Sequence, residues 1–418
     1  MVLPTSRQIR EVVGGLHDEL LQLAIDLVRI PSITGDEAAL QGWLGPRLQE
    51  WGLAVETVTP DEEQLRAHPA FCDDGNNPVR PSLVARYGNP ADRAALILNG
   101  HVDVVPTGAR QLWDAEPFSG RVHRKRLWGR GACDMKGGLA AAAMALRAVQ
   151  LMGLEPTRPV LLQCVVGEET GGVGTLATLM NGPSADLAVI AEPTGLDLCP
   201  LQSGALSFRL SVPGVASHGA TRELGISAYE KLHVLYEALR KLETDRHQNY
   251  RHPLFHGGLA APLSVGVVQV GEWISTVPDA ALAEGRYGVF VGESVAVAKQ
   301  QFEDAVRNAC LSDDFLREHP ARVEWIEGQF EPGATDPDLP VVQRVVENHR
   351  EMLGRDPVQR GVPYGSDLRL FTNHAGIPAI LYGPGELRLA HAANEHLELE
   401  ELQTATAVMA GLIARSIA

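Results

Sequence analysis

Four short apolar runs along the chain end at, or shortly before, residues that commonly bind metals. The runs cover residues 94–99, 160–166, 187–191 and 378–382. Runs of this length and composition are typical of buried strands in a parallel sheet. The residues that follow the runs are His101 and Asp103, Glu168 and Glu169, Glu192 and, after a Gly-Pro-Gly loop, His391.

The position of these residues at strand ends predicts that they meet. In open α/β sheets the reactive crevice lies at the carboxyl ends of the strands. Segments that are far apart in the sequence can therefore bring their side chains to one place. We predict that His101, the pair Glu168–Glu169, Glu192 and His391 converge there as the imidazole and carboxylate ligands of a metal site.

The segments between these runs predict helices. Apolar and charged positions recur at helical spacing over residues 7–29, and a second helix is expected over 37–51 after an Asp36 cap. The alanine-rich segment 135–150 favours a helix and disfavours a strand. Residues 60–82 are rich in Pro, Asp, Asn and Gly, which indicates an irregular surface loop. The alternation predicts an α/β fold, with a mostly parallel sheet and helices on both of its faces.

The pattern changes after about residue 205. Residues 206–212 alternate apolar and polar positions, as in a sheet with one face in water. Signals in the order helix, strand, strand, helix and strand follow near residues 227–243, 263–270, 281–291, 294–310 and 322–326. We therefore expect a small α+β domain of order β-α-β-β-α-β over residues 205–328. It would be inserted into a catalytic domain formed by residues 1–204 and 329–418.

Length and composition narrow the class of protein. A chain of 418 residues is expected to form two domains rather than one core. Its 36 Lys and Arg against 52 Asp and Glu give a net charge of −16, which disfavours nucleic acid and anionic membranes as partners. The basic stretch 121–126 is interpreted as a solvated hairpin edge. Scattered cysteines, and no signal-peptide or membrane-spanning pattern, predict a cytoplasmic protein with reduced thiols.

Taken singly, the polar residues near the strand ends also have ordinary structural explanations. His101 and Asp103 lie on the same side of a short extended segment, where they could serve a metal or simply cap a loop. Asp134 precedes the alanine-rich helix and could cap its N-terminus. With His101 upstream, a carboxylate that bridges two metals is the favoured interpretation of Asp134.

The adjacent acids Glu168 and Glu169 are the sharpest local signal. Two carboxylates at the end of an apolar strand lie near like charge, which a cation would relieve. Successive residues of an extended segment point apart, so that one can bind metal while the other faces a bound water. That division suits a hydrolase, in which metal acidifies water and a carboxylate moves its proton. Solvated loop acids are the structural alternative.

Four motifs together resemble those of the co-catalytic zinc amidohydrolases and exopeptidases. This family includes acetylornithine deacetylase, succinyl-diaminopimelate desuccinylase and aminoacylase. The motifs, which match in order and spacing, are LNGHVDVVP at 98–106, GACDMKGG at 131–138, Glu168–Glu169 and EPT at 192–194. The resemblance extends from about residue 10 to the C-terminus. It is specific for the family and uninformative about the substrate.

The resemblance implies two Zn²⁺ ions per chain, with Co²⁺ or Mn²⁺ as substitutes. Asp134 would bridge the two ions. His101 and Glu192 would hold one ion, and Glu169 and His391 would hold the other.

The resemblance also implies roles for residues that do not bind metal. Asp103 would orient the ring of His101, and Glu168 would be the general base. A cis peptide bond is implied between Asp134 and Met135.

The inserted domain resembles the family's lid or dimerisation domain. His218 matches a histidine that, in dimeric relatives, reaches the partner's active site and stabilises the oxyanion. Arg286 and Arg369 occupy positions where relatives bind a substrate carboxylate, a role that suits the forked guanidinium. Ser275 is a departure, because many relatives carry Asn there, and it weakens assignment to a particular member.

We interpret the chain as a hydrolase of the amide bond in an N-acyl amino acid, with acetylornithine-type deacylation as the nearest example. The substrate is expected to carry a carboxylate, and the lid domain is expected to form a homodimer. A dipeptidase or carboxypeptidase of the same family is the alternative. A non-catalytic metal-binding interaction protein is less favoured, because Glu168 and every ligand are retained.

Overall fold

The computed structural model describes residues 3–417. They form two compact units. The first unit consists of the residues up to Leu201, Ala334–Arg360 and the residues from Ser366 onward. The second unit consists of Gln202–Gly333 and Gly361–Gly365. The catalytic and lid roles of the predicted domains stay predictions.

A large sheet with a parallel centre forms the core of the first unit. The strand order is β1-β2-β7-β4-β9-β19-β10-β17, and β18 pairs with β10. The strands are β1 Ala54–Val58, β2 Ser82–Tyr87, β7 Val160–Val165, β4 Leu96–His101, β9 Ala188–Ile190, β19 Ala379–Leu381, β10 Leu198–Gln202, β17 Gly333–Ala334 and β18 Gln359–Val362. Strands β7, β4, β9 and β19 run parallel, whereas β1, β2 and β10 pair antiparallel. The mixed α/β fold with a mostly parallel centre is confirmed.

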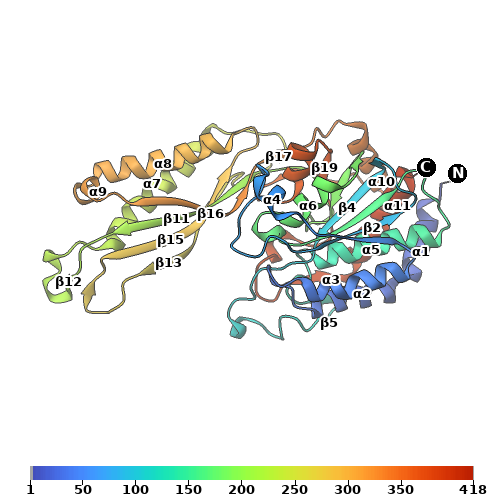
Figure 1. Ribbon diagram of the computed structural model, residues 1–418, viewed down its shortest axis with the longest axis horizontal. Coiled ribbons are helices and arrows are strands. Elements are labelled where there is room, and N and C mark those ends of the chain that lie inside the picture. Colours follow the sequence, from blue (N-terminus) through green and yellow to red (C-terminus); the bar gives the residue numbers. More distant parts are fainter. Residues whose placement is uncertain (1–2, 418) are drawn as a thin grey trace. The chain divides into compact units, whose positions relative to one another are not determined.

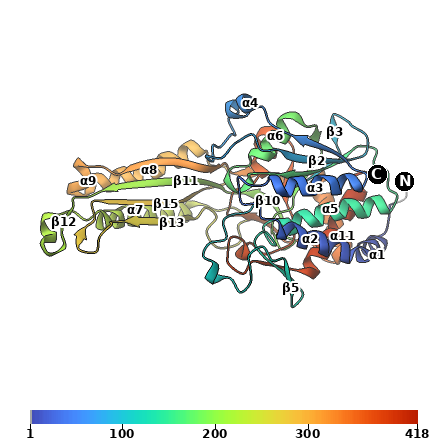
Figure 2. The ribbon, with the colours of Figure 1, turned by 60° about the horizontal axis from the view of Figure 1, so that its bottom comes forward.

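Helices cover this sheet on both sides, and α6 lies on the opposite side from α3 and α5 (Figure 2). The helices are α1 Ser6–Gly15, α2 His17–Arg29, α3 Ala38–Glu50, α4 Glu62–Ala67, α5 Lys136–Leu151, α6 Val173–Asn181, α10 Pro340–Leu353 and α11 Leu399–Ser416. The alanine-rich α5 is buried along most of its length. A side chain at Gly138 would place Cβ 2.0 Å from the carbonyl oxygen of Ala191. The start of α5 is therefore held close to the end of β9.

Two N-terminal predictions need correction. The single helix expected over 7–29 is two helices, which separate at Leu16 directly after Gly14 and Gly15. Glycine is a poor helix former, which gives a physical reason for the break. The second helix begins at Ala38, and Glu37 rather than the predicted Asp36 stands at its cap position, where no side chain caps the helix.

The segment 60–82 is not simply an irregular surface loop. It contains the short helix α4 and a buried ion-pair network. Arg80 Nη1 lies 2.6 Å from Glu37 Oε1, and Arg80 Nη2 lies 2.9 Å from Asp74 Oδ2. All three side chains are buried. Asp74 also accepts a hydrogen bond from the Thr170 hydroxyl at 2.7 Å. These paired charges fold the polar segment against the turn that follows β7, an effect that polar composition alone does not reveal.

The second unit contains a four-stranded antiparallel sheet of order β13-β15-β11-β16. Its main elements are β11 Gly204–Pro213, α7 Ala228–Asn249, β13 Leu263–Val270, β15 Ala280–Val289, α8 Val295–Ser312, α9 Asp314–Glu318 and β16 Arg322–Phe330. Residues of β11 alternate between buried and half-buried, as predicted. Helices α7 and α8 pack together on the sheet around a core that includes Phe208, Leu235 and Phe302 (Figure 1). The predicted β-α-β-β-α-β order is confirmed.

The basic stretch 121–126 forms a hairpin in the first unit. Strands β5 Arg121–His123 and β6 Arg126–Trp128 pair antiparallel, and β6 also pairs with β20 His396–Glu398. All three residues of β5 are exposed, which confirms the solvated hairpin edge. None of the helices within residues 3–417 combines the length and hydrophobicity needed to cross a bilayer.

Candidate metal centre

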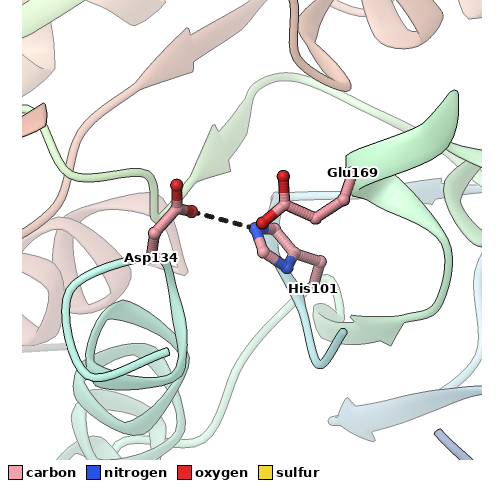
Figure 3. A group of neighbouring side chains, drawn as sticks. All are labelled: His101, Asp134 and Glu169. Carbon is pink, nitrogen blue, oxygen red and sulfur yellow. Dashed lines mark hydrogen bonds and ion pairs between the residues drawn. The ribbon is translucent and has the colours of Figure 1, made fainter. Parts of the chain in front are cut away.

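His101 is the last residue of β4, and its ring is fully buried. Its Nδ1 lies 2.9 Å from the carbonyl oxygen of Asp103, and its Nε2 lies 3.2 Å from Oδ1 of Asp134. The first contact orients the ring, so that Nε2 faces the acidic cluster (Figure 3). The nearer group to Nδ1 is thus the backbone of Asp103, because its carboxylate Oδ1 is 3.6 Å away.

The Asp103 carboxylate binds the turn after β7. Its two oxygens accept hydrogen bonds from the backbone N–H groups of Glu168 and Glu169, each at 3.2 Å. The Thr34 hydroxyl donates a third hydrogen bond at 3.0 Å. Asp103 therefore connects the end of β4 with the turn that carries both glutamates. This agrees with the structural alternative for His101 and Asp103, in which they stabilise a loop.

Glu168 and Glu169 lie in a 3₁₀ turn, Glu168–Thr170, and not in an extended segment. The turn begins at Gly167, whose φ of 66° is in the left-handed region that favours glycine. The two side chains nevertheless diverge. Glu168 Oε2 lies 4.0 Å from Nε2 of His101, whereas Glu169 Oε2 lies 3.0 Å from Nε2 of His391. The turn, rather than strand geometry, separates the two side chains. The division of roles between the glutamates stays a prediction.

Asp134 faces two imidazoles. Its Oδ1 lies 3.2 Å from His101 Nε2, and its Oδ2 lies 3.5 Å from His391 Nε2. The peptide bond from Asp134 to Met135 is cis, as the resemblance implies. Met135, rather than Asp134, stands at the cap position of α5, so the carboxylate is not a helix cap. The two oxygens are arranged as expected for a carboxylate that bridges two cations.

Two overlapping groups of candidate ligands result. His101, Asp134 and Glu169 form one group, and His101, Glu168 and Glu192 form the other, with ligand atoms within 4.8 Å of one another in each. Glu192 follows β9, is buried, and lies 3.9 Å from His101 Nε2. His391 borders the first group through Asp134 and Glu169, although its side chain is 55% exposed. The predicted convergence of strand-end residues is present in the first unit.

The charged forms of the buried side chains Glu168 and Glu192 are unfavourable in this cluster. Burial, together with the charge of Glu192, raises the pKa of Glu168 well above its usual value. Burial and the charge of Asp134 do the same to Glu192. Among the described residues, no Lys or Arg forms an ion pair with Glu168, Glu192 or Asp134. Cations bound in this cluster would remove the repulsion.

The two imidazoles are drawn toward their charged form by the same carboxylates. Burial disfavours the charge on His101, but Asp134 and its neighbours outweigh burial and raise the pKa of the ring well above 6.5. Glu169 raises the pKa of His391 to about 9. Burial opposes ionisation of Asp134, yet the two histidines lower its pKa. Since a histidine ligand must be neutral, metal binding would release protons.

The donor set fits a zinc pair. Imidazole nitrogen and carboxylate oxygen are zinc ligands. His101 and Glu192 could hold one ion, and Glu169 and His391 the other, with Asp134 between them. The division stays a prediction.

One predicted residue of the first unit does not join this cluster. Arg369 belongs to the first unit and is buried, but its Nη2 donates to the carbonyl oxygens of Gly171, at 2.9 Å, and Ala70, at 3.3 Å. It ties two backbone segments together, and its role toward a substrate carboxylate stays a prediction. His218 and Arg286 belong to the second unit.

Two buried acids near the site were not predicted. Asp367 accepts a hydrogen bond from the Thr175 hydroxyl at 2.5 Å, and burial raises its pKa to about 6. Glu395 is fully buried and accepts the backbone N–H of Asp134 at 3.0 Å. Both residues lie in polar loop sequences, so that only the folded chain shows their burial. The nearest sequence signals were their neighbours, Arg369 and His391.

Imidazoles and carboxylates that meet at the strand ends of an α/β sheet are the ligand types of metal-dependent hydrolases. The fold and the site therefore indicate this class of protein. Residues 97–415 match the family described as Peptidase family M20/M25/M40. The chain belongs to this family, and this confirms the resemblance seen in the motifs. As a member it is an enzyme that hydrolyses amide bonds.

Individual relatives differ in what they act on. The chain is 30% identical over 329 residues to N-formyl-4-amino-5-aminomethyl-2-methylpyrimidine deformylase of Halalkalibacterium halodurans, which covers 74% of this chain and 76% of the relative. It is 28% identical to succinyl-diaminopimelate desuccinylase of Rhodopseudomonas palustris, over 96% of this chain and 99% of the relative. The YXEP protein of Bacillus subtilis, described as a dinuclear metal binding peptidase, has a similar fold. Its TM-score is 0.63 at 16% identity, over 97% and 99% of the two chains.

Proposed function

We propose that this chain is a two-zinc deacylase that hydrolyses the amide bond of a small N-acyl amino acid-type substrate in the cytoplasm. The observation that carries the proposal is the placement of Asp134 between two imidazoles, with Oδ1 3.2 Å from His101 and Oδ2 3.5 Å from His391. The dinuclear site of the structurally similar YXEP protein supports the pair of ions. The five cysteines are free thiols, which supports a reducing compartment.

The residues of the cluster would divide the chemistry. Two bound cations would lower the pKa of a water molecule and stabilise negative charge on the substrate oxygen. Glu168 would accept the proton of the attacking water and deliver it to the leaving nitrogen. Its backbone is fixed by Asp103, and its carboxylate is buried beside His101 and Glu192. A buried base with a raised pKa is suited to hold a proton between the two steps.

The names of the relatives support release of a small acyl group. A deformylase and a desuccinylase both remove an acyl group from nitrogen, and both align with most of this chain. The peptidase described for the YXEP fold favours the alternative of a dipeptidase or carboxypeptidase. Turnover of N-acetyl amino acids, compared with unblocked dipeptides of the same side chains, separates the two. Hydrolysis of the dipeptides alone would replace the deacylase by the peptidase.

Arg286 is a candidate for the substrate carboxylate. It lies on β15, burial lowers its pKa, and its Nη2 donates to the carbonyl oxygen of Pro363 at 3.1 Å. Within residues 3–417 no carboxylate pairs with its guanidinium. A half-buried guanidinium without a counter-charge is suited to bind an anion.

Amidation of the substrate's carboxylate is therefore expected to weaken binding by about 2–5 kcal/mol, because one partner of a desolvated charge pair is lost. The measurement is kcat/KM for an N-acyl amino acid and its carboxamide, with wild-type protein and with Arg286→Met. The penalty of amidation should shrink in the variant. Equal turnover of the acid and the amide by the wild type would show that Arg286 does not bind a substrate carboxylate. It would also contradict the proposed preference for an N-acyl amino acid substrate.

His218 supports a homodimer that completes the site across subunits. It lies on the short strand β12 Ser217–His218, is exposed, and accepts the Ala220 N–H at Nδ1. The neutral ring then carries its proton on Nε2, which leaves a donor for an oxyanion. The Gly219 N–H donates to the backbone carbonyl oxygen of Ser275, which follows the strongly exposed residues Trp273 and Ile274. Exposed apolar side chains of this kind mark surfaces that pair with another protein.

Mixing two inactive variants tests this arrangement. His218→Ala chains and Glu168→Ala chains should each be inactive, and hybrid dimers should regain activity because one of the two sites is intact. The measurement is turnover after subunit exchange, with exchange followed by differently labelled chains. Proven exchange without recovery would place His218 in the site of its own chain.

A further inference from the structure

Arg130 and Glu395 form a buried ion pair that has no part in the proposed chemistry. Arg130 Nη1 lies 2.7 Å from Glu395 Oε2, and the side chains are only 3% and 0% exposed. Removing two charges from water is costly, and their attraction offsets this cost only when further hydrogen bonds satisfy both groups. The other hydrogen bonds of Arg130 and Glu395 therefore show which backbone segments the pair positions.

The second oxygen of Glu395 holds the backbone at the candidate bridging residue. Oε1 accepts the N–H of Cys133 at 2.9 Å and the N–H of Asp134 at 3.0 Å. Two N–H groups that converge on one carboxylate oxygen fix the course of the chain immediately before the Asp134 side chain. This oxygen is separate from the one that meets Arg130.

The guanidinium of Arg130 holds the loop that carries the candidate ligand His391. Its Nη2 donates to the carbonyl oxygen of His391 at 3.3 Å and to that of Pro106 at 3.2 Å, and Nη1 donates to Ala392 at 3.2 Å. His391 has a φ of 60°, which is uncommon for a residue with a side chain. Such a conformation persists only where the surrounding structure determines it, and the Arg130 fork provides that restraint.

One pair thus holds the backbone of two candidate ligands that come from distant parts of the chain. Asp134 Oδ2 and His391 Nε2 are 3.5 Å apart, and neither Arg130 nor Glu395 contacts these atoms. We propose that Arg130 and Glu395 are a positioning pair that sets the separation of Asp134 and His391, and thereby the affinity of the metal site those residues share with Glu169. This inference rests on the proposed function, because it requires that the cluster binds metal.

Glu395→Gln tests the pair. Glutamine keeps the shape and one oxygen for the two N–H groups, but its amide nitrogen then meets the donors of Arg130. We expect a folded protein in which at least one of two zinc equivalents binds about 10–100-fold more weakly, the usual effect of changing a group that supports a ligand. Competition with a chelator measures the affinity. Excess zinc should restore part of the turnover, which a general loss of structure would not allow.

Two further variants make the result specific. Arg130→Lys keeps the charge but not the fork, so the His391 loop should lose its restraint and zinc affinity should fall in the same way. Glu398→Gln is the matched control. It removes the ion pair with Arg126 at 2.6 Å, on the strand that follows Glu395, where the side chains are 39% and 45% exposed. Its zinc affinity should equal that of the wild type.

The outcomes separate this inference from the proposed function. Wild-type protein that binds no zinc would overturn both. Wild-type protein with two equivalents, together with unchanged affinity in folded Glu395→Gln or in folded Arg130→Lys, would overturn the positioning role and leave the function intact. Equal weakening by Glu398→Gln would also overturn it, because an exposed pair nearby would then matter as much. If Glu395→Gln fails to fold, Arg130→Lys decides by the same measurement.

Discussion

Replacement of Glu168 by Gln is expected to reduce turnover by about 10²–10⁴, the range typical of positioned acid–base catalysis. The amide keeps the size of the carboxylate but cannot accept a proton from water. The backbone N–H of residue 168 would still donate to Asp103, so the turn should keep its shape. Zinc content and KM should therefore stay close to the wild-type values. Steady-state kinetics and metal analysis of the same preparation check both parts.

Glu169→Gln is the matched comparison, because it makes the same chemical change at the adjacent residue. Glu169 lies 3.0 Å from His391, and it is the proposed ligand. This variant should lose zinc as well as activity, and added zinc should restore part of the activity. If Glu168→Gln keeps near-full turnover with its zinc in place, the base lies elsewhere and the proposed division between the two glutamates is wrong.

Replacement of Asp134 by Ala is expected to remove both zinc ions rather than one. Its two oxygens face His101 and His391, one from each half of the proposed site. Without this carboxylate, two cations would also lose the negative charge between them. Metal content should fall from about two equivalents to near zero, and activity should fall with it.

Asp36→Ala provides the control for Asp134→Ala. Asp36 is an exposed acid in the same unit, and it makes no capping bond to α3. Its loss should change neither metal content nor turnover. Retention of two zinc ions in Asp134→Ala would show that Asp134 does not bridge the ions, whereas loss of one ion would make Asp134 a ligand of a single site.

The convergence of the site could be predicted from two local signals, which are the apolar runs and the polar residues that follow them. Apolar runs such as 160–166 form buried strands, and parallel neighbours place their carboxyl ends at one edge. The register aligns His101 with Val165 at the end of β7, three residues before Glu168. Asp134 and His391 lie farther from a strand end, and their signals were the alanine-rich helix that follows Asp134 and the Gly-Pro-Gly loop between the run 378–382 and His391. The fold class followed from the same alternation of strands and helices.

What could not be predicted depends on contacts between distant segments. Asp103 holds the turn at Glu168 by its carboxylate and orients His101 by its carbonyl oxygen, a difference that the HxD motif does not specify. Arg130 and Glu395 are 265 residues apart, and each looks like an ordinary polar loop residue until the chain is folded. Long-range ion pairs of this kind leave no periodic signal in one sequence.

The activity of metal-free protein, measured as zinc is added in known equivalents, shows whether the site holds a pair of zinc ions. The substrates are a panel of N-acetyl amino acids. We expect no turnover without metal, a rise as zinc is added, and a break in the curve at about two equivalents per chain. Turnover that persists after complete removal of metal, or a break at one equivalent, would contradict a paired zinc site built around Asp134.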